Sequence, residues 1–352
     1  MQFSKYSTYS LLALISLVLF QFSNSASAQP VPADDENIPF LVTFGKDAPI
    51  SRGDDDYVQT FFLMVPKTQK TPFYVRIFDP DCGGANDEMY DEADTKVKFS
   101  VYGGPRAYSN PNAREPNPVG DYDSGNLLAS KTFGEDAKYD NQWYTFGPFN
   151  PTDGDSDNKF NSYIFKIIAQ GLTGNDGNLY RYFFSTYPDK NSRIEGANAF
   201  TFEYTFRMPD KAGAICHLYP YIDDDVTSVK QFNFDWDEDG VLKIVSHEKD
   251  GEWVKMSNDA DWEESQHPIM KTEQNASLDF QFVKGGNTPQ KNNNLCFYIR
   301  NQYGEFVAFY TIPIGGVPKY KYDLEMIENF KSGEKYNTGC DTCFEKLYKE
   351  DK

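Results

Sequence analysis

Apolar and polar residues alternate with a period of two in short runs along the chain. The clearest run is 200–207, where Phe200, Phe202, Tyr204 and Phe206 fall on one face of an extended chain. This period is that of a β-strand with one buried face. Further runs that predict strands are 38–44, 57–65, 73–78, 97–102, 143–149, 163–168, 180–187 and 215–222. No stripe of helical period occurs before residue 318.

A second group of alternating runs starts near residue 226. The runs 230–237 and 241–247 flank Asp239-Gly240, and an Asp-Gly pair between alternating runs predicts a tight hairpin with Gly240 at positive φ. The run 253–256 extends this meander, and 277–283, 295–300 and 306–312 complete the group, with a turn at 301–304. The sequence thus predicts an all-β fold of two tandem β-sandwiches. The first is jelly-roll-like and covers 29–225. The second is smaller, immunoglobulin-like, and covers 226–316.

Both ends of the sequence differ from this pattern. Residues 1–28 have Lys5, a short apolar run from Leu11 to Phe22, and Ala26-Ser27-Ala28, which together predict a cleaved signal peptide. The run is shorter than the roughly 20 residues of a spanning helix, and no later run is long enough. We therefore expect a protein that is secreted, periplasmic or at the cell surface. We expect residues 317–352 to form a charged, partly helical tail.

The formal net charge of −19 makes some partners improbable. Nucleic-acid backbones need clustered Lys and Arg, and anionic lipid surfaces favour basic proteins, so neither is expected as a partner. Five cysteines are present, an odd number, and export permits disulfides. Cys340 and Cys343 in the tail form a C-x-x-C pair, which we interpret as a local disulfide or a tethering thiol.

Acidic residues crowd two loops near the start of the mature chain. Asp54, Asp55 and Asp56 precede one predicted strand, and Asp79, Asp81, Asp87 and Glu88 follow another. If 57–65 and 73–78 form a hairpin through a turn at 67–71, the two loops meet at one end of a sheet. Calcium takes oxygen ligands from such loops, so we expect a calcium site there. The alternative is a pair of solvated turns with Asx caps.

The segment Gly53-Asp54-Asp55-Asp56-Tyr57, with Phe61 and Val65-Pro66 after it, resembles the opening of bacterial pre-peptidase C-terminal domains. The resemblance covers about residues 50–103. It implies a secreted, calcium-binding β-sandwich of the kind appended to exported enzymes. The Asp-x-Asp-Leu element of that family has no clear counterpart, and residues 96–102 stand where it would fall.

A second acidic candidate is the run Asp235-Trp236-Asp237-Glu238-Asp239-Gly240. It matches the first half of an EF-type calcium loop through Asp235, Asp237 and Asp239. Ser246 stands where such a loop has its bidentate Glu, and the flanking runs are strands. An EF-hand is therefore not expected, and a plain hairpin is the alternative interpretation.

Catalytic motifs are missing from the sequence. It has three histidines, no His-Glu-x-x-His, no Gly-x-Ser-x-Gly and no phosphate-binding loop. Aromatic residues are abundant, and sugar rings stack on exposed aromatic faces. Candidates for such a platform are Tyr102, Tyr108, Trp143 and Trp236, with Tyr144, Trp253 and Trp262 also considered. Core packing is the alternative for each of them.

The sequence therefore favours an exported, non-catalytic binding or adhesion protein that is supported by calcium and recognises a glycan or a cell-surface protein. A secreted hydrolase acting on glycans and a structural envelope component are the alternatives. An enzyme needs a cleft with a titratable pair of shifted pKa, whereas an exposed aromatic strip on a sheet favours binding.

Overall fold

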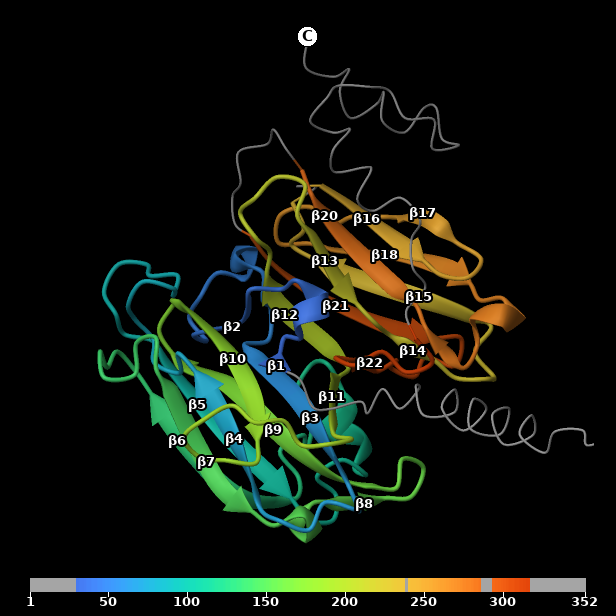
Figure 1. The fold of residues 1–352 in the computed structure, drawn as a ribbon. Helices are drawn as coiled ribbons and strands as arrows, with labels where there is room; N and C mark the ends of the chain where they lie inside the picture. The colour runs from blue at the N-terminus through green and yellow to red at the C-terminus, as the bar shows by residue number, and fades with distance from the viewer. Residues whose placement is uncertain (1–29, 238–239, 286–292, 317–352) are drawn as a thin grey trace, which may run out of the picture.

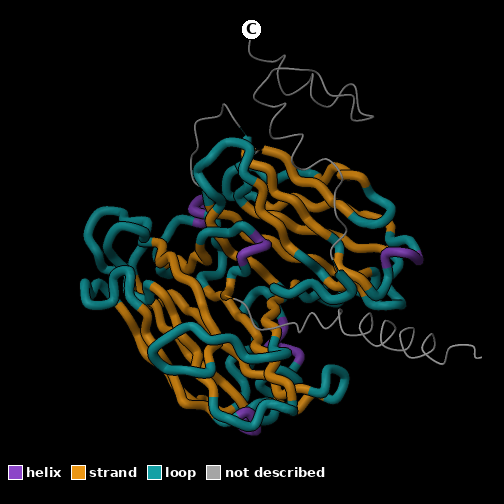
Figure 2. Tube along the Cα trace, in the orientation of Figure 1, coloured by secondary structure: helices purple, strands orange, loops and turns teal. Residues whose placement is uncertain are grey.

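Antiparallel strands make up most of the part of the chain that the computed structural model describes, which is residues 30–237, 240–285 and 293–316 (Figures 1 and 2). Its helical segments are single 3-10 turns of three or four residues: Asp34–Glu36, Ile50–Arg52, Pro111–Arg114, Pro151–Asp153 and Lys271–Glu273. The all-β class predicted from the alternating runs is confirmed. No described helix is long and apolar enough to cross a membrane.

One large sheet runs through the whole molecule. Its strands follow the order β18, β15, β21, β12, β2, β10, β4 and β7, and β1 also pairs with β10. Their bounds are β18 Trp262–Pro268, β15 Ser228–Phe234, β21 Asn294–Asn301, β12 Glu203–Arg207, β2 Phe40–Phe44, β10 Gly177–Ser185, β4 Phe73–Phe78, β7 Trp143–Phe149 and β1 Pro30–Val31. The neighbouring strands in this sheet pair antiparallel.

A second sheet covers one half of the large sheet, on the lower left in Figure 1. Its order is β22, β11, β3, β9, β5 and β6, with β8 on β9. The bounds are β22 Phe309–Tyr310, β11 Asn198–Thr201, β3 Val58–Pro66, β9 Ser162–Thr173, β5 Lys96–Gly103, β6 Asn126–Phe133 and β8 Asp155–Asp157. Phe61 of β3 meets Tyr204 of β12 across the interface, with ring centroids 5.3 Å apart. Aromatic side chains of both sheets thus fill a sandwich core.

A small sheet covers the other half, on the upper right in Figure 1. It consists of β13 (Ile215–Leu218), β20 (Asp279–Lys284), β16 (Gly240–Val245) and β17 (Asp250–Val254), and the pair β14 (Tyr221–Ile222) and β19 (Ala276–Ser277) lies separately. Phe297 of β21 packs against Phe280 and Phe282 of β20, with ring centroids 5.2 and 5.1 Å apart. The large sheet therefore buries one face along its length.

Main-chain pairing joins the two halves. β12 pairs with β21, where Glu203 lies opposite Tyr298, and β11 pairs with β22, where Phe200 lies opposite Tyr310. A single apolar cluster includes side chains from both halves. Two strands before residue 225, β13 and β14, pair with strands after it. The predicted boundary at residue 225 thus falls within a continuous hydrogen-bonded structure.

Both predicted hairpins at acidic segments are wrong. β3 and β4 lie in opposing sheets, since β3 pairs with β9 and β11 whereas β4 pairs with β10 and β7. β15 and β16 also belong to different sheets. Gly240 is not among the glycines with positive φ, contrary to the prediction. A larger residue would not fit at this position, because a Cβ there would lie 2.0 Å from the carbonyl oxygen of Val283. Alternation predicts the buried face of a strand but not its partner.

The turn predicted at 301–304 is confirmed. Gly304 has φ +82° and its amide donates to the carbonyl of Asn301 at 3.0 Å. Phe306 then forms an isolated antiparallel β-bridge with Arg300. This turn brings Phe306 against the outer face of β21.

Candidate functional site: an aromatic strip and its acidic flank

Aromatic side chains line the outer face of the large sheet near its β18 edge. Phe232 of β15 lies opposite Tyr298 of β21, and the two rings stack at 4.6 Å with an interplanar angle of 16°. Trp262 of β18 lies 5.1 Å from Tyr298 and Phe306 lies 5.7 Å from it, both measured between ring centroids. We call Phe232, Trp262, Tyr298 and Phe306 the aromatic strip.

The strip is on the outer face because the alternate residues of the same strands are in the core. Phe297 and Ile299, on either side of Tyr298, are fully buried among the core residues. Phe232, Trp262 and Phe306 are half-buried, and Tyr298 is 9% exposed. Phe232, Trp262 and Phe306 therefore keep part of their surface open, as stacking of a ligand ring requires. Tyr298 is the buried ring on which they pack.

Polar side chains border the strip on the β18 side. Glu264 and Gln266 are exposed on β18, and Lys230 of β15 forms a 2.8 Å ion pair with Glu264. The indole Nε1 of Trp262 donates to Oδ2 of Asp55 at 2.9 Å. Asp55 belongs to a loop distant in sequence, and this hydrogen bond holds the indole ring in its orientation.

Three carboxylates converge beside the strip. Asp235, Asp237 and Asp259 each offer an oxygen, and these oxygens lie within 4.8 Å of one another. Oxygens bound to one calcium at about 2.3–2.6 Å can be up to about 5 Å apart, so the group fits a calcium ion. It is the one group of three or more metal-binding side chains found in residues 30–237, 240–285 and 293–316.

Backbone geometry holds this acidic group together. Asp235 and Asp237 have left-handed φ values of 56° and 59°, and Ala260 has 55°. The Ala260 amide donates to Oδ1 of Asp235 at 2.6 Å. The acidic group thus joins the end of β15 to the loop that leads into Trp262.

Asp235 and Asp237 were expected at such a site, and Asp239 lies outside the described residues. Asp259 was not anticipated, because it is 22 positions beyond Asp237. The available signal was the acidic run Asp259-Ala260-Asp261 immediately before Trp262.

The three aspartates of the Gly53–Tyr57 loop make separate bonds. Oδ1 of Asp54 accepts from the amides of Asp56 and Tyr57 at 3.1 and 3.0 Å, and Oδ1 of Asp56 accepts from the amide of Val58 at 2.8 Å. These are Asx caps of their own turn, as in the alternative from sequence. The turn is not a solvated one, however, because Asp54 is buried. Asp55 is bonded to Trp262 as described above.

Asp54 and Asp56 of this loop form an acidic group with Glu203 of β12, in which Asp54 and Glu203 are buried. Oε1 of Glu203 accepts from Sγ of Cys296 at 2.9 Å. Burial raises the pKa of Asp54 to about 6 and that of Glu203 to about 8. Burial, followed by repulsion from Glu203, also raises the pKa of Asp56 well above its usual range. These carboxyls favour a protonated state or a compensating cation.

The second acidic loop is bonded mainly to its own surroundings. Asp79 accepts from the side chain of Asn86 at 2.5 Å and from the amide of Asn141 at 2.8 Å. Asp87 accepts from the amides of Gly83 and Leu179 at 2.6 and 2.7 Å.

Burial raises the pKa of each aspartate in this second loop, to about 6 for Asp81 and about 8 for Asp87. Oδ1 of Asp81 is buried and has no hydrogen-bond partner. These carboxyls are therefore costly to ionise in their present setting.

Glu88 connects the two predicted acidic loops. It forms an ion pair with Arg207 and accepts from Nδ2 of Asn294 at 2.9 Å. Gly53 lies against the same asparagine, since a Cβ on Gly53 would lie 2.6 Å from Cβ of Asn294. The two loops are neighbours, but no three of their carboxylates are grouped at metal-binding distances.

Of the four principal aromatic candidates, two are buried in the core. Tyr102 is 8% exposed and Trp236 is 3% exposed, and Trp236 packs against Phe282 at 5.8 Å between ring centroids. Neither has an open ring face, and packing explains their presence. Trp143 is half-buried against Phe78, with ring centroids 5.3 Å apart.

Tyr108 packs on Phe62 and Phe200 at 5.5 and 5.6 Å between ring centroids. Its position is beside a small pocket, partly open to solvent, that is lined by Thr60, Phe62, Ala113, Arg114, Glu115, Pro116, Thr201, Phe202 and Glu203. Glu203 also lies opposite Tyr298 of the strip. The pocket and the strip are therefore adjacent.

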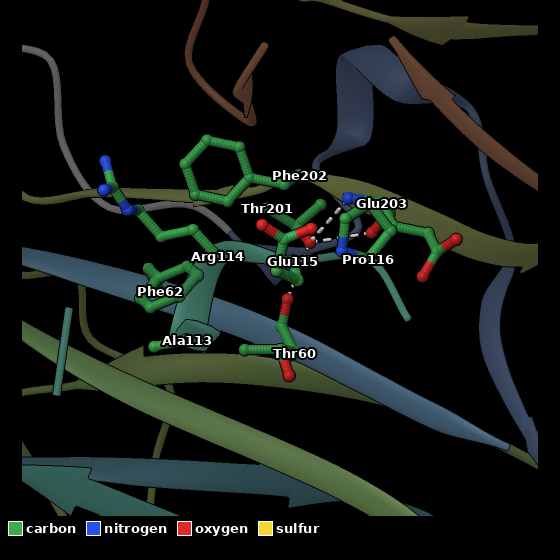
Figure 3. Close-up of a pocket in the computed structure, with 9 residues that line it drawn as sticks. All are labelled: Thr60, Phe62, Ala113, Arg114, Glu115, Pro116, Thr201, Phe202 and Glu203. Carbon is green, nitrogen blue, oxygen red and sulfur yellow. Dashed lines mark hydrogen bonds between the residues drawn. The ribbon is translucent and has the colours of Figure 1, made fainter. Parts of the chain in front are cut away.

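Two carboxylates belong to the pocket lining, but they do not face each other. Figure 3 shows the Glu203 side chain extending away from Glu115. A glycosidase places its two carboxylates across the scissile bond, and this pair lacks that arrangement.

Neither a scan against protein-family models nor a search of curated proteins found a match to this sequence.

The expected signal peptide at 1–28 and the tail cysteines Cys340 and Cys343 lie outside the described residues. The three cysteines within them, Cys82, Cys216 and Cys296, are free and buried.

Proposed function

We propose that this chain is an exported, non-catalytic binding protein that recognises a glycan through the aromatic strip, in the form of two fused β-sandwiches stiffened by calcium. The observation that carries the proposal is the strip itself: Phe232, Trp262 and Phe306 are half-buried and pack around the buried Tyr298 on the outer face of one sheet, with a polar border. Sugar rings present C–H faces to such rings and hydroxyls to such borders.

The position of the acidic group supports a role for calcium at the same site. Asp235 directly follows Phe234 at the end of β15, and Asp259 lies three residues before Trp262. A cation bound by Asp235, Asp237 and Asp259 would hold the loop that carries Trp262. It would order the strip before a ligand arrives, which reduces the entropy lost on binding.

The secreted hydrolase receives less support than binding. The pocket next to the strip contains Glu203, whose raised pKa would suit a general acid. Its carboxyl is bonded to Cys296, however, and extends away from Glu115. The two acids required for glycoside hydrolysis are therefore not presented together.

The test uses the protein comprising residues 29–352 and a panel of plant, fungal and bacterial oligosaccharides. We expect binding to a subset of glycans, with at least tenfold weaker binding for Phe232→Ala combined with Trp262→Ala, since each aromatic contact contributes about 1 kcal/mol. Tyr187→Ala is the matched control, because Tyr187 is 47% exposed and lies outside the strip. A panel without any bound glycan, or equal affinity of the double variant, would contradict the proposal.

A further inference from the structure

Arg300 lies over the aromatic strip. It is two residues after Tyr298 on β21 and therefore on the same outer face. Its guanidinium carbon is 4.4 Å from the ring centroid of Phe306, 5.8 Å from that of Tyr298 and 5.9 Å from that of Phe232. Cation–π attraction to three rings holds the group in place.

No carboxylate within residues 30–237, 240–285 and 293–316 forms an ion pair with Arg300. Its Nε is buried without a hydrogen-bond partner. A buried donor without an acceptor is unfavourable. The guanidinium thus has hydrogen-bonding capacity left for an anion.

The residue opposite Arg300 on β15 is Lys230, another cation. Like charges directly opposite each other destabilise a pair of strands. Lys230 is neutralised by Glu264, at 2.8 Å, whereas no described carboxylate forms an ion pair with Arg300. The strip therefore has a localised positive charge on a protein whose formal net charge is −19.

We propose that Arg300 makes the strip selective for acidic saccharides whose sugar ring carries a carboxylate, as a uronic acid does. This inference rests on the proposed glycan-binding function and names the class of glycan. The ring of the sugar stacks on the strip while its carboxylate receives hydrogen bonds from the guanidinium. Arg is suited to this because its planar fork donates two parallel hydrogen bonds to one carboxylate.

The test compares each sugar with an uncharged form of itself. Trimers of galacturonic, glucuronic and mannuronic acid, and the methyl ester of each, are titrated into residues 29–352 by calorimetry. We expect the acid of at least one pair to bind about tenfold or more tightly than its ester, the scale of a hydrogen bond to a charged group. Arg300→Met should remove this difference between the acid and its ester.

Arg300→Lys separates charge from the shape of the guanidinium. It retains the charge but loses the fork, so an intermediate preference for the acid is expected. Lys138→Gln is the control, since it removes one exposed cation from the loop between β6 and β7. Thermal unfolding of each variant checks that the fold is retained.

Four results overturn the inference in distinguishable ways. Equal affinity for acids and esters means that the strip binds sugars without selecting charge. A preference for acids that survives in Arg300→Met means that another cation supplies the selectivity; both results leave glycan binding intact. If neutral glycans bind at the strip and no uronic acid does, only the acidic class is refuted, whereas an absence of all binding removes the proposed function too.

Discussion

Removing one carboxylate from the acidic group should remove most of the stabilisation by calcium. The perturbation is Asp259→Asn. Asp259 is exposed, whereas Asp235 is buried, so replacing Asp259 disturbs the fold least. It leaves two of the three charged oxygens that lie within 4.8 Å of one another.

The magnitude follows from ligand linkage. An ion that binds only the folded protein stabilises it by RT ln(1 + [L]/Kd), which is about 2.7 kcal/mol at a hundredfold excess of calcium over Kd. Unfolding entropy is about 2.1 cal/mol/K per residue, so for a protein of this size 1 kcal/mol corresponds to about 1.5 °C in Tm. We therefore expect Tm to rise by about 4 °C in the wild type. Magnesium should have a smaller effect, because it demands tighter octahedral geometry.

The assay is differential scanning calorimetry of residues 29–352 with a chelator and with millimolar calcium. Asp259→Asn should lose at least half of the calcium-dependent rise. Asp225→Asn is the matched control, since Asp225 is exposed in the same half of the molecule and outside the acidic group. Equal Tm values with chelator and calcium in the wild type would refute the calcium site, and an unchanged rise in Asp259→Asn would place calcium elsewhere.

Three further predictions concern stability. Gly240→Ala should destabilise the protein by about 1–3 kcal/mol in urea unfolding, because the new Cβ would meet the carbonyl oxygen of Val283 at 2.0 Å. Burial raises the pKa of Glu203 to about 8 from an ordinary value of 4.5. The folded protein therefore binds a proton that the unfolded chain releases, and the free energy of unfolding should increase as pH falls from 8 towards 4.5. Glu203→Gln should weaken this pH dependence. Lys249→Met should cost about 3–5 kcal/mol in thermal unfolding, since it leaves the buried carboxylate of Glu273, 2.8 Å from Nζ, without its cation.

Controls and contradicting results are specific to each change. Unaltered urea unfolding of Gly240→Ala would show that β16 can move away from β20. An identical pH dependence in Glu203→Gln would mean that other carboxyls dominate. Lys159→Met is the comparison for Lys249→Met, because its ion pair with Asp223 is at the surface and should cost about 1 kcal/mol or less; equal losses in both would contradict the argument from burial.

The strands could be predicted from the sequence because alternation is a local property. The run 200–207 became β11 and β12, and 230–237 became β15. Partners could not be predicted, since pairing depends on contacts between distant segments. β3 and β4 are near in sequence and both amphipathic, yet they face each other across the core instead of forming a hairpin.

The candidate site, like the fold, could be predicted only where its residues are close together in the sequence. Asp235 and Asp237 stood out because they are close in sequence, and Asp259 did not because only the fold brings it to them. Trp262 was one of several aromatic candidates, whereas Phe232, Tyr298 and Phe306 read as ordinary strand residues. The orientation of a face toward core or solvent distinguishes Tyr298 from the buried Phe297. The resemblance to pre-peptidase C-terminal domains stays a prediction.

Fluorine NMR of protein containing 5-fluorotryptophan tests the central claim, that the aromatic strip binds glycan, most directly. The four tryptophans give separate resonances that single Trp→Phe variants assign. A bound glycan should shift the resonance of Trp262 saturably and leave that of Trp236, which is buried in the core, unchanged. Saturable shifts at Trp143 with none at Trp262 would contradict the account.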